Sequence, residues 1–341
     1  MPDGAPAPLR GTPAAEEPPV LSVEGLETVF DTRDGPVHAV NGVSFHVRRG
    51  ELLGVVGESG SGKSVTMMSV LDLLPHPPAR VTGGRILFNG RDVRKMQGAE
   101  LRRLRGGEIG FVFQDPMTSL NPVFTVGWQI MEPLRAHMGL SKPAARTRAA
   151  ELLAMVGIPS PESRLGDYPH QFSGGMRQRV MIAIALACEP QALIADEPTT
   201  ALDVTIQAQI LELMKDLRAR TGAAMVWVTH DLGVIAGIAD RVMVMYAGQV
   251  VEEADVGTLF ADPRHPYTQA LLETMPSVEG PRARRLRTIP GQPPSLSAPP
   301  ASCPFAARCR HVFDQCLKEL PPLRDVRPGH RARCWLPQAV A

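Results

Sequence analysis

The sequence of 341 residues has no apolar run long enough to span a bilayer. The best candidate, Val180–Ala195, is interrupted by Glu189-Pro190. Residues 1–19 are rich in Pro and Ala and lack the apolar core of a signal peptide, so we expect a disordered tail and a cytosolic location. Net charge is also small, formally +1 at pH 7, which gives no electrostatic reason to expect a nucleic-acid partner.

Cysteine is scarce and unevenly distributed. Cys188 lies at the end of an apolar helix candidate, which predicts simple core packing. The other four cysteines lie near the end of the chain, at Cys303, Cys309, Cys316 and Cys334. Because a reducing cytosol disfavours disulfides, this clustering indicates a metal site.

The most informative segment that is present is the sequence GESGSGKS at residues 57–64. It fits the phosphate-loop pattern of nucleotide triphosphatases, and it lies between an apolar strand candidate and a helix candidate. Backbone N–H groups of such a loop surround a phosphate, Lys63 reaches the β- and γ-phosphates, and the Ser64 hydroxyl contacts Mg²⁺. A glycine-rich turn without a ligand is the disfavoured alternative. The residues predicted to bind nucleotide here are Gly57, Ser59, Gly60, Ser61, Gly62, Lys63, Ser64 and Val65.

A second apolar run, residues 192–195, ends in two adjacent acids, Asp196 and Glu197. A carboxylate at the end of a strand beside a phosphate loop can hold Mg²⁺, directly or through water, and we assign this role to Asp196. We assign Glu197 as the general base that polarises the attacking water. Without the phosphate loop, a solvated turn would explain the pair equally well.

Strand and helix candidates alternate along most of the chain, which predicts an α/β fold with a parallel core. Residues 20–47 alternate apolar and polar side chains and predict an antiparallel hairpin or a small β-subdomain. Strands are expected at 52–56, 85–89, 109–113, 193–195, 225–229, 242–245 and 249–251, and helices at 65–74, 128–157, 180–187 and 206–220. From about Pro276 the chain becomes rich in Pro and Arg, which marks a boundary before a small C-terminal module.

Ser173, Gly174 and Gly175 precede another predicted helix and form a second candidate anion site. Two such sites suggest that two copies meet around shared nucleotides. The segment resembles the signature motif of ATP-binding-cassette (ABC) ATPases, although Phe172 and Met176 depart from the usual Leu and Gln. The resemblance implies a P-loop NTPase core of the ABC type, with an antiparallel β-subdomain and an α-helical subdomain at about residues 120–190.

Further motifs of the ABC ATPases follow in order along the chain. Gln114 resembles the glutamine that contacts Mg²⁺ or water and couples to the membrane subunit, and Asp203 resembles the aspartate of the loop that crosses the dimer interface. His230 resembles the histidine that contacts the γ-phosphate. Phe30 is the candidate for stacking on adenine, with a core phenylalanine as the alternative. The resemblance thus implies catalytic roles for Gln114, Glu197 and His230, and Mg²⁺ binding by Ser64, Gln114 and Asp196.

The C-terminal part resembles the extension of oligopeptide/dipeptide permease ATPases. The resemblance is carried by residues 265–272 (HPYTQALL), 289–291 (IPG) and 303–305 (CPF). We therefore expect a tail at 1–19, an ABC ATPase domain at 20–262, and an extension with a four-cysteine module at 263–341.

The cysteines have the spacing C-x5-C-x6-C-x17-C. Zinc sites usually contain closer pairs, whereas wider spacing suits a [4Fe-4S] cluster, which some members of this family carry. Zinc and no metal remain alternatives. Arg308, Arg310 and His311 would surround the cluster with positive charge. We expect a structural staple, so that Ser at all four positions loosens the tail and leaves the phosphate chemistry intact.

The resemblance implies the ATP-hydrolysing subunit of a bacterial importer for di- or oligopeptides or a related solute. Its implied partners are a second homologous ATPase, two transmembrane permeases and an extracytoplasmic solute-binding protein, at the cytoplasmic face of the membrane. Two alternatives are a soluble ABC ATPase acting on nucleic acid or ribosomes, and a redox-sensing regulator. A single cassette of near-neutral charge weighs against the first of these.

Overall fold

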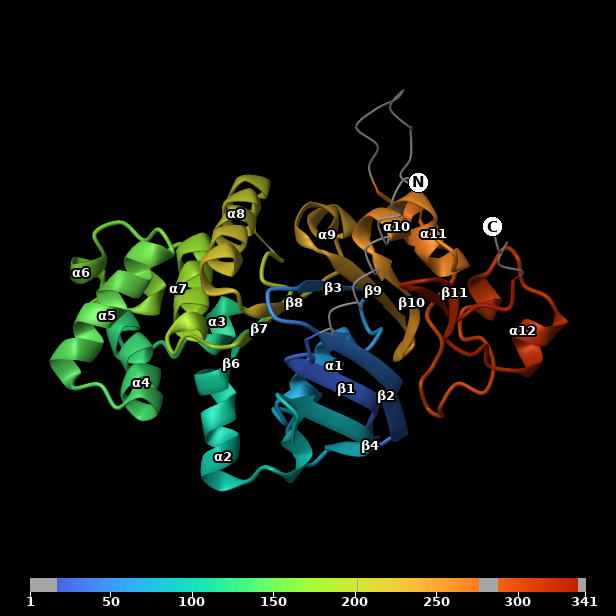
Figure 1. The fold of residues 1–341 in the computed structure, drawn as a ribbon, viewed down its shortest axis with the longest axis horizontal. Coiled ribbons are helices and arrows are strands. Elements are labelled where there is room, and N and C mark those ends of the chain that lie inside the picture. The colour runs from blue at the N-terminus through green and yellow to red at the C-terminus, as the bar shows by residue number, and fades with distance from the viewer. Residues whose placement is uncertain (1–16, 201, 276–287, 337–341) are drawn as a thin grey trace, which may run out of the picture.

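Two β-sheets organise the molecule (Figure 1), whose computed structural model describes residues 17–200, 202–275 and 288–336. The smaller sheet is antiparallel, in the order β2-β1-β4-β5, and the larger is mixed, in the order β11-β12-β10-β9-β3-β8-β7-β6. The strands are β1 (Leu21–Thr32), β2 (Gly35–Val47), β3 (Leu52–Val56), β4 (Ala79–Phe88), β5 (Arg91–Asp92), β6 (Ile109–Val112), β7 (Ala192–Asp196), β8 (Ala224–Thr229), β9 (Arg241–Tyr246), β10 (Gln249–Asp255), β11 (Arg324–Arg327) and β12 (His330–Ala332). The predicted hairpin is confirmed as β1 and β2. Of the predicted tail, residues 1–16 lie outside the described residues.

The helices cover the larger sheet and form a separate group on the left of Figure 1. They are α1 (Lys63–Val70), α2 (Gly98–Arg103), α3 (Pro116–Ser119), α4 (Val126–Met138), α5 (Lys142–Met155), α6 (Pro161–Arg164), α7 (Gly174–Leu186), α8 (Val204–Thr221), α9 (Leu232–Ile238), α10 (Val256–Ala261), α11 (Pro266–Glu273) and α12 (Asp314–Lys318). Four short turns of helix are η1 (Val93–Lys95), η2 (Leu104–Glu108), η3 (Pro169–Gln171) and η4 (Ala306–Arg308). The helical subdomain, α3 to α7, is as expected. The range 128–157 is two helices rather than one, because Gly139 ends α4 at φ 66° and Ser141 caps α5.

The parallel part of the larger sheet determines where the chemistry lies. Strands β9, β3, β8, β7 and β6 run parallel, so their carboxyl ends meet at one edge. The phosphate loop follows β3, the acid pair ends β7, and His230 follows β8, which lies between them. The fold therefore brings together residues that are up to about 170 positions apart in sequence.

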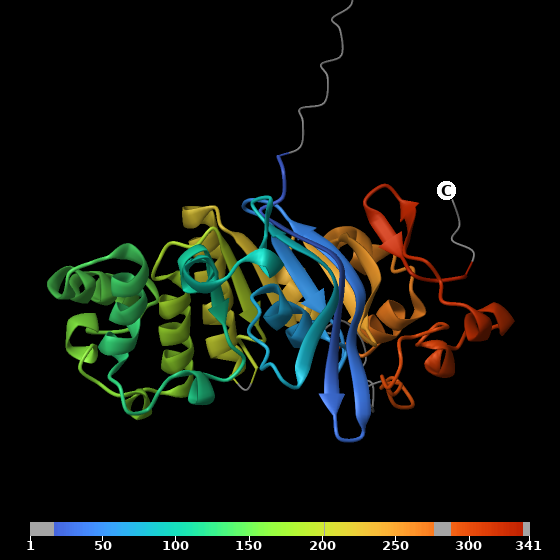
Figure 2. The same ribbon diagram turned by 90° about the horizontal axis from the view of Figure 1, so that it is seen from below.

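Two hydrophobic cores hold the sheets and helices together. Alternate residues of β3 face opposite sides: Leu53 and Val55 pack toward the antiparallel sheet, and Leu52 and Val56 pack toward the helices. Helix α1 lies between the two sheets. Its Met67 and Val70, and Leu71 directly after it, belong to the same core as Leu53 and Val55. Figure 2 shows the antiparallel sheet in front of the larger one when the molecule is seen from below.

The C-terminal extension continues the larger sheet rather than forming a detached module. β12 pairs antiparallel with β10, and β11 pairs with β12. Buried His330 and Glu252 join these strands, with Nε2 and Oε1 2.8 Å apart. Within residues 17–200, 202–275 and 288–336, no helix has the length and apolar character needed to cross a membrane.

Candidate nucleotide site

The phosphate loop lies between β3 and α1 and packs closely against the backbone of neighbouring strands. A Cβ at Gly62, where φ is 95°, would lie 2.4 Å from the Ala39 carbonyl oxygen, and one at Gly57 would lie 2.2 Å from that of Met245. Only glycine fits these two positions. The buried Lys63 ammonium donates to the carbonyl oxygens of Gly57 (2.7 Å) and Glu58 (3.0 Å). Burial lowers the pKa of Lys63.

The remaining predicted loop residues surround this lysine. Ser59 and Gly60 form the exposed crest of the loop, whereas Ser61 is buried beneath it. Ser64 and Val65 lie half-buried in the first turn of α1. The loop therefore presents its crest and the N-terminus of α1 to the position where phosphates would bind.

Ser64 and Asp196 lie side by side as the magnesium interpretation requires. The Ser64 hydroxyl donates to Asp196 Oδ1 at 2.9 Å. Burial raises the pKa of Asp196 to about 6, although the bond from Ser64 acts in the opposite direction. Hydroxyl and carboxylate oxygens are hard ligands of the type that Mg²⁺ prefers, so the residues present fit this ion.

Glu197 is the point where the predicted catalytic residues meet. Its Oε2 accepts from Gln114 Nε2 at 3.1 Å and lies 3.3 Å from His230 Nδ1. The Thr200 hydroxyl also donates to Oε2, at 2.8 Å. Thr200 was not predicted from the sequence, although its position three residues after the acid is a local signal. Three strand ends thus orient one carboxylate beside the Ser64–Asp196 pair.

The second anion site lies elsewhere in the same chain. Ser173 caps α7, its hydroxyl accepting from the Met176 N–H at 3.3 Å, and Ser173 and Gly174 are exposed. Phe172 is buried in the core. Helix α7 packs on β6, three strands away from β3 in the sheet. The fold therefore does not bring Ser173–Gly175 onto the phosphate loop of its own chain.

Comparison with known proteins identifies the family. Residues 40–200 match the ABC transporter family, and residues 251–316 match the oligopeptide/dipeptide transporter C-terminal region. The chain belongs to the ABC transporter family. It is 53% identical to the oligopeptide transport ATP-binding protein OppD of Bacillus subtilis over 93% of this chain and 88% of that protein. It is 48% identical to the dipeptide transport ATP-binding protein DppD of Escherichia coli, over 93% and 97%.

Solved structures of ABC ATPases share the fold. The dimeric structure of the ATP-binding cassette MJ0796 bound to ADP and phosphate is 30% identical, with a TM-score of 0.62, and the match covers 69% of this chain and 98% of that one. The ABC ATPase fold and the ATPase activity expected from the sequence are thus confirmed.

Two further residues were expected to bind nucleotide, Asp203 and Phe30. Asp203 caps α8, accepting from the Ile206 N–H at 2.9 Å, and is exposed; Ala201 of the same loop lies outside the described residues. Phe30 lies near the end of β1, opposite Val37 and Ala79. It is half-buried and belongs to neither hydrophobic core. The stacking of Phe30 on adenine stays a prediction.

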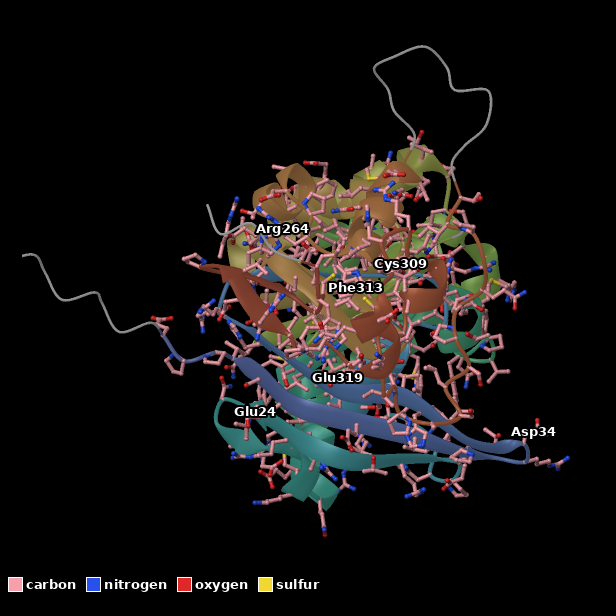
Figure 3. All side chains as sticks on the ribbon, turned by 90° about the vertical axis from the view of Figure 1, so that its right-hand side faces the viewer. Glu24, Asp34, Arg264, Cys309, Phe313 and Glu319 are labelled. Atoms are coloured by element: carbon pink, nitrogen blue, oxygen red, sulfur yellow. The ribbon has the colours of Figure 1, made fainter. Side chains whose placement is uncertain are left out.

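The four C-terminal cysteines lie in the C-terminal extension, where Figure 3 labels Cys309. Burial, with a smaller contribution from the other three thiols nearby, raises the pKa of Cys303 to about 11. Backbone N–H groups point at the sulfurs of Cys309 (3.4 Å, from His311) and Cys334 (3.5 Å, from Leu336). None of these cysteines forms a disulfide. Among the described residues, no group of three or more His, Cys, Asp or Glu side chains is placed to hold a metal ion.

One of the three basic residues predicted to surround the cysteines, Arg308, has another partner. Arg308 turns to the phosphate loop and binds the Glu58 carboxylate, so its prediction is wrong. Arg310 pairs with Glu273 at 3.0 Å, and its charge opposes the effect of burial, which raises the pKa of Cys309. The Nε2 of His311 lies 3.2 Å from Arg310 Nε. A carboxylate attracts an arginine more strongly than neutral thiols do.

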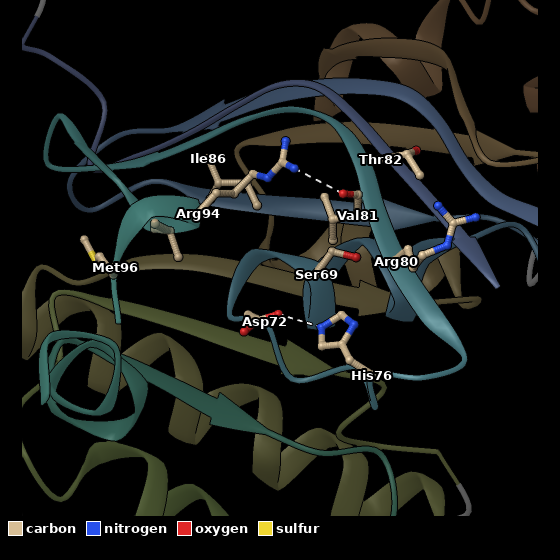
Figure 4. Close-up of a pocket in the computed structure, with 10 residues that line it drawn as sticks. Ser69, Asp72, His76, Arg80, Val81, Thr82, Ile86, Arg94 and Met96 are labelled. Carbon is tan, nitrogen blue, oxygen red and sulfur yellow. Dashed lines mark hydrogen bonds and ion pairs between the residues drawn. The ribbon is translucent and has the colours of Figure 1, made fainter. Parts of the chain in front are cut away.

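A cavity of about 550 Å³ lies between α1 and β4 (Figure 4). Its charged groups have partners: His76 Nε2 is 2.7 Å from Asp72 Oδ1, and Arg94 donates to the Val81 carbonyl oxygen at 3.1 Å. Because it lies past the C-terminal end of α1, and the phosphate loop precedes the N-terminal end, it is not the nucleotide site.

Proposed function

We propose that this ABC ATPase powers the import of di- or oligopeptides from the cytoplasmic face of a bacterial membrane, where it is a peripheral subunit. The observation that carries the ATPase chemistry is the convergence of Gln114, Thr200 and His230 on Glu197, beside Ser64 and Asp196. The peptide assignment is supported by the match of residues 251–316 to the transporter-specific C-terminal region and by the names of the relatives.

The proposed reaction divides the work among residues of two ATPases. Lys63 binds the β- and γ-phosphates of ATP, and Ser64 and Asp196 hold Mg²⁺, which neutralises charge on the phosphates. Glu197 accepts a proton from water, whose oxygen attacks the γ-phosphorus as the bond to ADP breaks. Gln114 and His230 orient Glu197 and the water. Because Ser173–Gly175 cannot reach its own phosphate loop, we propose that it covers the ATP of a second subunit, with Asp203 at that interface.

The partner ATPase is proposed to be homologous rather than identical, and the other partners are two transmembrane permeases and an extracytoplasmic solute-binding protein. The permease surface lies next to Gln114. Exposed apolar side chains follow Gln114 in the sequence, with Met117 at 64% and Trp128 at 45% exposure. Phe124 stacks on Trp128 with ring centroids 4.0 Å apart. An exposed apolar surface of this kind is typical of a protein interface.

The test is an anaerobic pull-down of the tagged chain from native membranes. We expect two multi-spanning proteins and a second ATPase with the wild type, and their loss with Trp128→Glu. Leu317→Glu is the matched control, since Leu317 is equally apolar and 63% exposed but lies in the C-terminal module. Recovery of the chain alone, or with ribosomes or DNA, would refute the transport function and favour a soluble ABC ATPase.

We also propose that Cys303, Cys309, Cys316 and Cys334 hold a [4Fe-4S] cluster with a structural role. Support comes from the mutual proximity of the thiols and from N–H groups directed at two sulfurs, which stabilise thiolates. Iron, sulfide and zinc contents of the anaerobically purified chain test this. Iron and sulfide in equal amounts are expected, whereas zinc or no metal would refute the cluster.

A further inference from the structure

Two segments of the C-terminal extension meet at Glu58, the second residue of the phosphate loop. Arg308 donates from Nη1 and Nη2 to the two carboxylate oxygens of Glu58, at 2.6 and 2.9 Å. The hydroxyl of Tyr267, on α11, accepts from the Glu58 N–H at 2.8 Å. The Glu58 carbonyl oxygen accepts from Lys63 at 3.0 Å. The backbone and side chain of Glu58 thus connect the extension to the phosphate-binding lysine.

The Arg308 side chain is buried and has several partners. Its side chain is only 3% exposed. Nε donates to the Pro290 carbonyl oxygen at 2.9 Å, and Nη2 donates to that of Ile289 at 3.2 Å. The guanidinium also lies over the ring of Tyr246, 5.8 Å from its centroid. A planar fork with this many partners is a geometry that lysine cannot reproduce.

The position of Arg308 depends on the cysteine module. It is the last residue of the single turn η4, between Cys303 and Cys309. The Cys303 carbonyl oxygen accepts from the Ala306 N–H at 3.0 Å, and the Cys309 N–H donates to the Ala306 carbonyl oxygen at 3.2 Å. Both ends of the turn that carries Arg308 are therefore fixed by cysteine residues.

The charge of the pair matters for phosphate binding. A carboxylate within the phosphate loop lies close to the site of the ATP phosphates, where an uncompensated negative charge would repel them. The bidentate bond to Arg308 neutralises this charge.

We propose that Arg308 is a positioning residue of the nucleotide site. It holds Glu58, and through Glu58 the phosphate loop and Lys63, in the conformation that receives ATP. The four-cysteine module thereby supports the ATP site, through Arg308, as well as the tail. The inference concerns ATP binding by the chain itself, so it stands or falls independently of the transported solute.

The test is titration of the full-length chain with a fluorescent ATP analogue, together with steady-state hydrolysis. We expect Arg308→Gln to raise Kd by about tenfold or more, because it leaves the Glu58 charge unpaired. Arg308→Lys should have an intermediate effect, because lysine keeps the charge but loses the fork. Arg310→Gln is the matched control: it removes an arginine two positions away that pairs with Glu273, and its Kd should stay within about twofold.

The double variant shows whether Arg308 acts through Glu58. If it does, Glu58→Gln in the Arg308→Gln chain should not weaken binding further and should restore part of it. KM should rise while kcat stays within about threefold, since the groups around Glu197 are unchanged. Wild-type Kd in Arg308→Gln, or effects that multiply in the double variant, would overturn the proposal. If Arg308→Gln fails to fold, Arg308→Lys and Glu58→Gln provide the same comparison.

Discussion

Glu197→Gln removes the proposed general base while it preserves the shape of the site. Gln114 and Thr200 both donate to a single oxygen of Glu197, and a glutamine oxygen can accept the same two bonds. The chain should therefore fold normally and bind ATP at least as tightly, because the variant loses a negative charge near the γ-phosphate.

The loss should fall on the chemical step. Removal of a positioned general base typically lowers the rate by about 10²–10⁴, equivalent to about 3–5 kcal/mol in activation free energy. The assay measures phosphate release by the complex recovered from membranes and the ATP retained after rapid gel filtration. We expect slow release and an ATP-filled, closed pair of subunits.

The control for this variant is Glu212→Gln, which removes an exposed carboxylate of α8 that pairs with Lys215. Its turnover should match that of the wild type. If Glu197→Gln hydrolyses ATP within a factor of about three of the wild-type rate, the general-base assignment is wrong and another group must activate the water.

Three further predictions address the borders of the site. Burial raises the pKa of Asp196 to about 6, so a proton competes with Mg²⁺ for this carboxylate below that pH. Mg²⁺-dependent ATP affinity should therefore fall by up to about tenfold per pH unit below about pH 6. Asp196→Asn should lack this pH dependence in the same titration. Phe30→Ala should raise Kd for ATP but not for inorganic triphosphate; equal effects on both would exclude adenine stacking. Replacing all four C-terminal cysteines with Ser should weaken ATP binding in a fluorescence titration as well as loosen the tail, because η4 carries Arg308. An unchanged Kd would show that the cysteine module does not affect ATP binding.

The phosphate loop, the acid pair and the strands before them were predictable because each is encoded locally. GESGSGKS needs glycine where a Cβ would strike the backbone, and the buried strands β3, β7 and β8 are continuous apolar runs. Their ends meet at one edge once the strands are parallel, so Gln114, Glu197 and His230 converge without any signal beyond strand position.

The split between α4 and α5 was missed although its signal was present in the sequence. Gly139 followed by Ser141 is an end-and-start pattern for two helices, but the helical periodicity continues across it. Strands β11 and β12 were missed for a different reason. They are short and polar, and they exist because β10 offers an edge, so pairing rather than propensity determines them.

The contact between Arg308 and Glu58 shows what sequence patterns cannot supply. The two residues are 250 positions apart, and neither belongs to a spaced set that would predict the other. In the sequence, Arg308 is one of several basic residues near cysteines. The negative charge of the predicted iron–sulfur cluster is enough to explain a basic residue there. Tyr246, Tyr267 and Phe305 pack against one another where η4 meets the phosphate loop. A sequence motif identifies the ATP site. Which other residues support that site depends on how the chain folds, and here they include Arg308 of the C-terminal module.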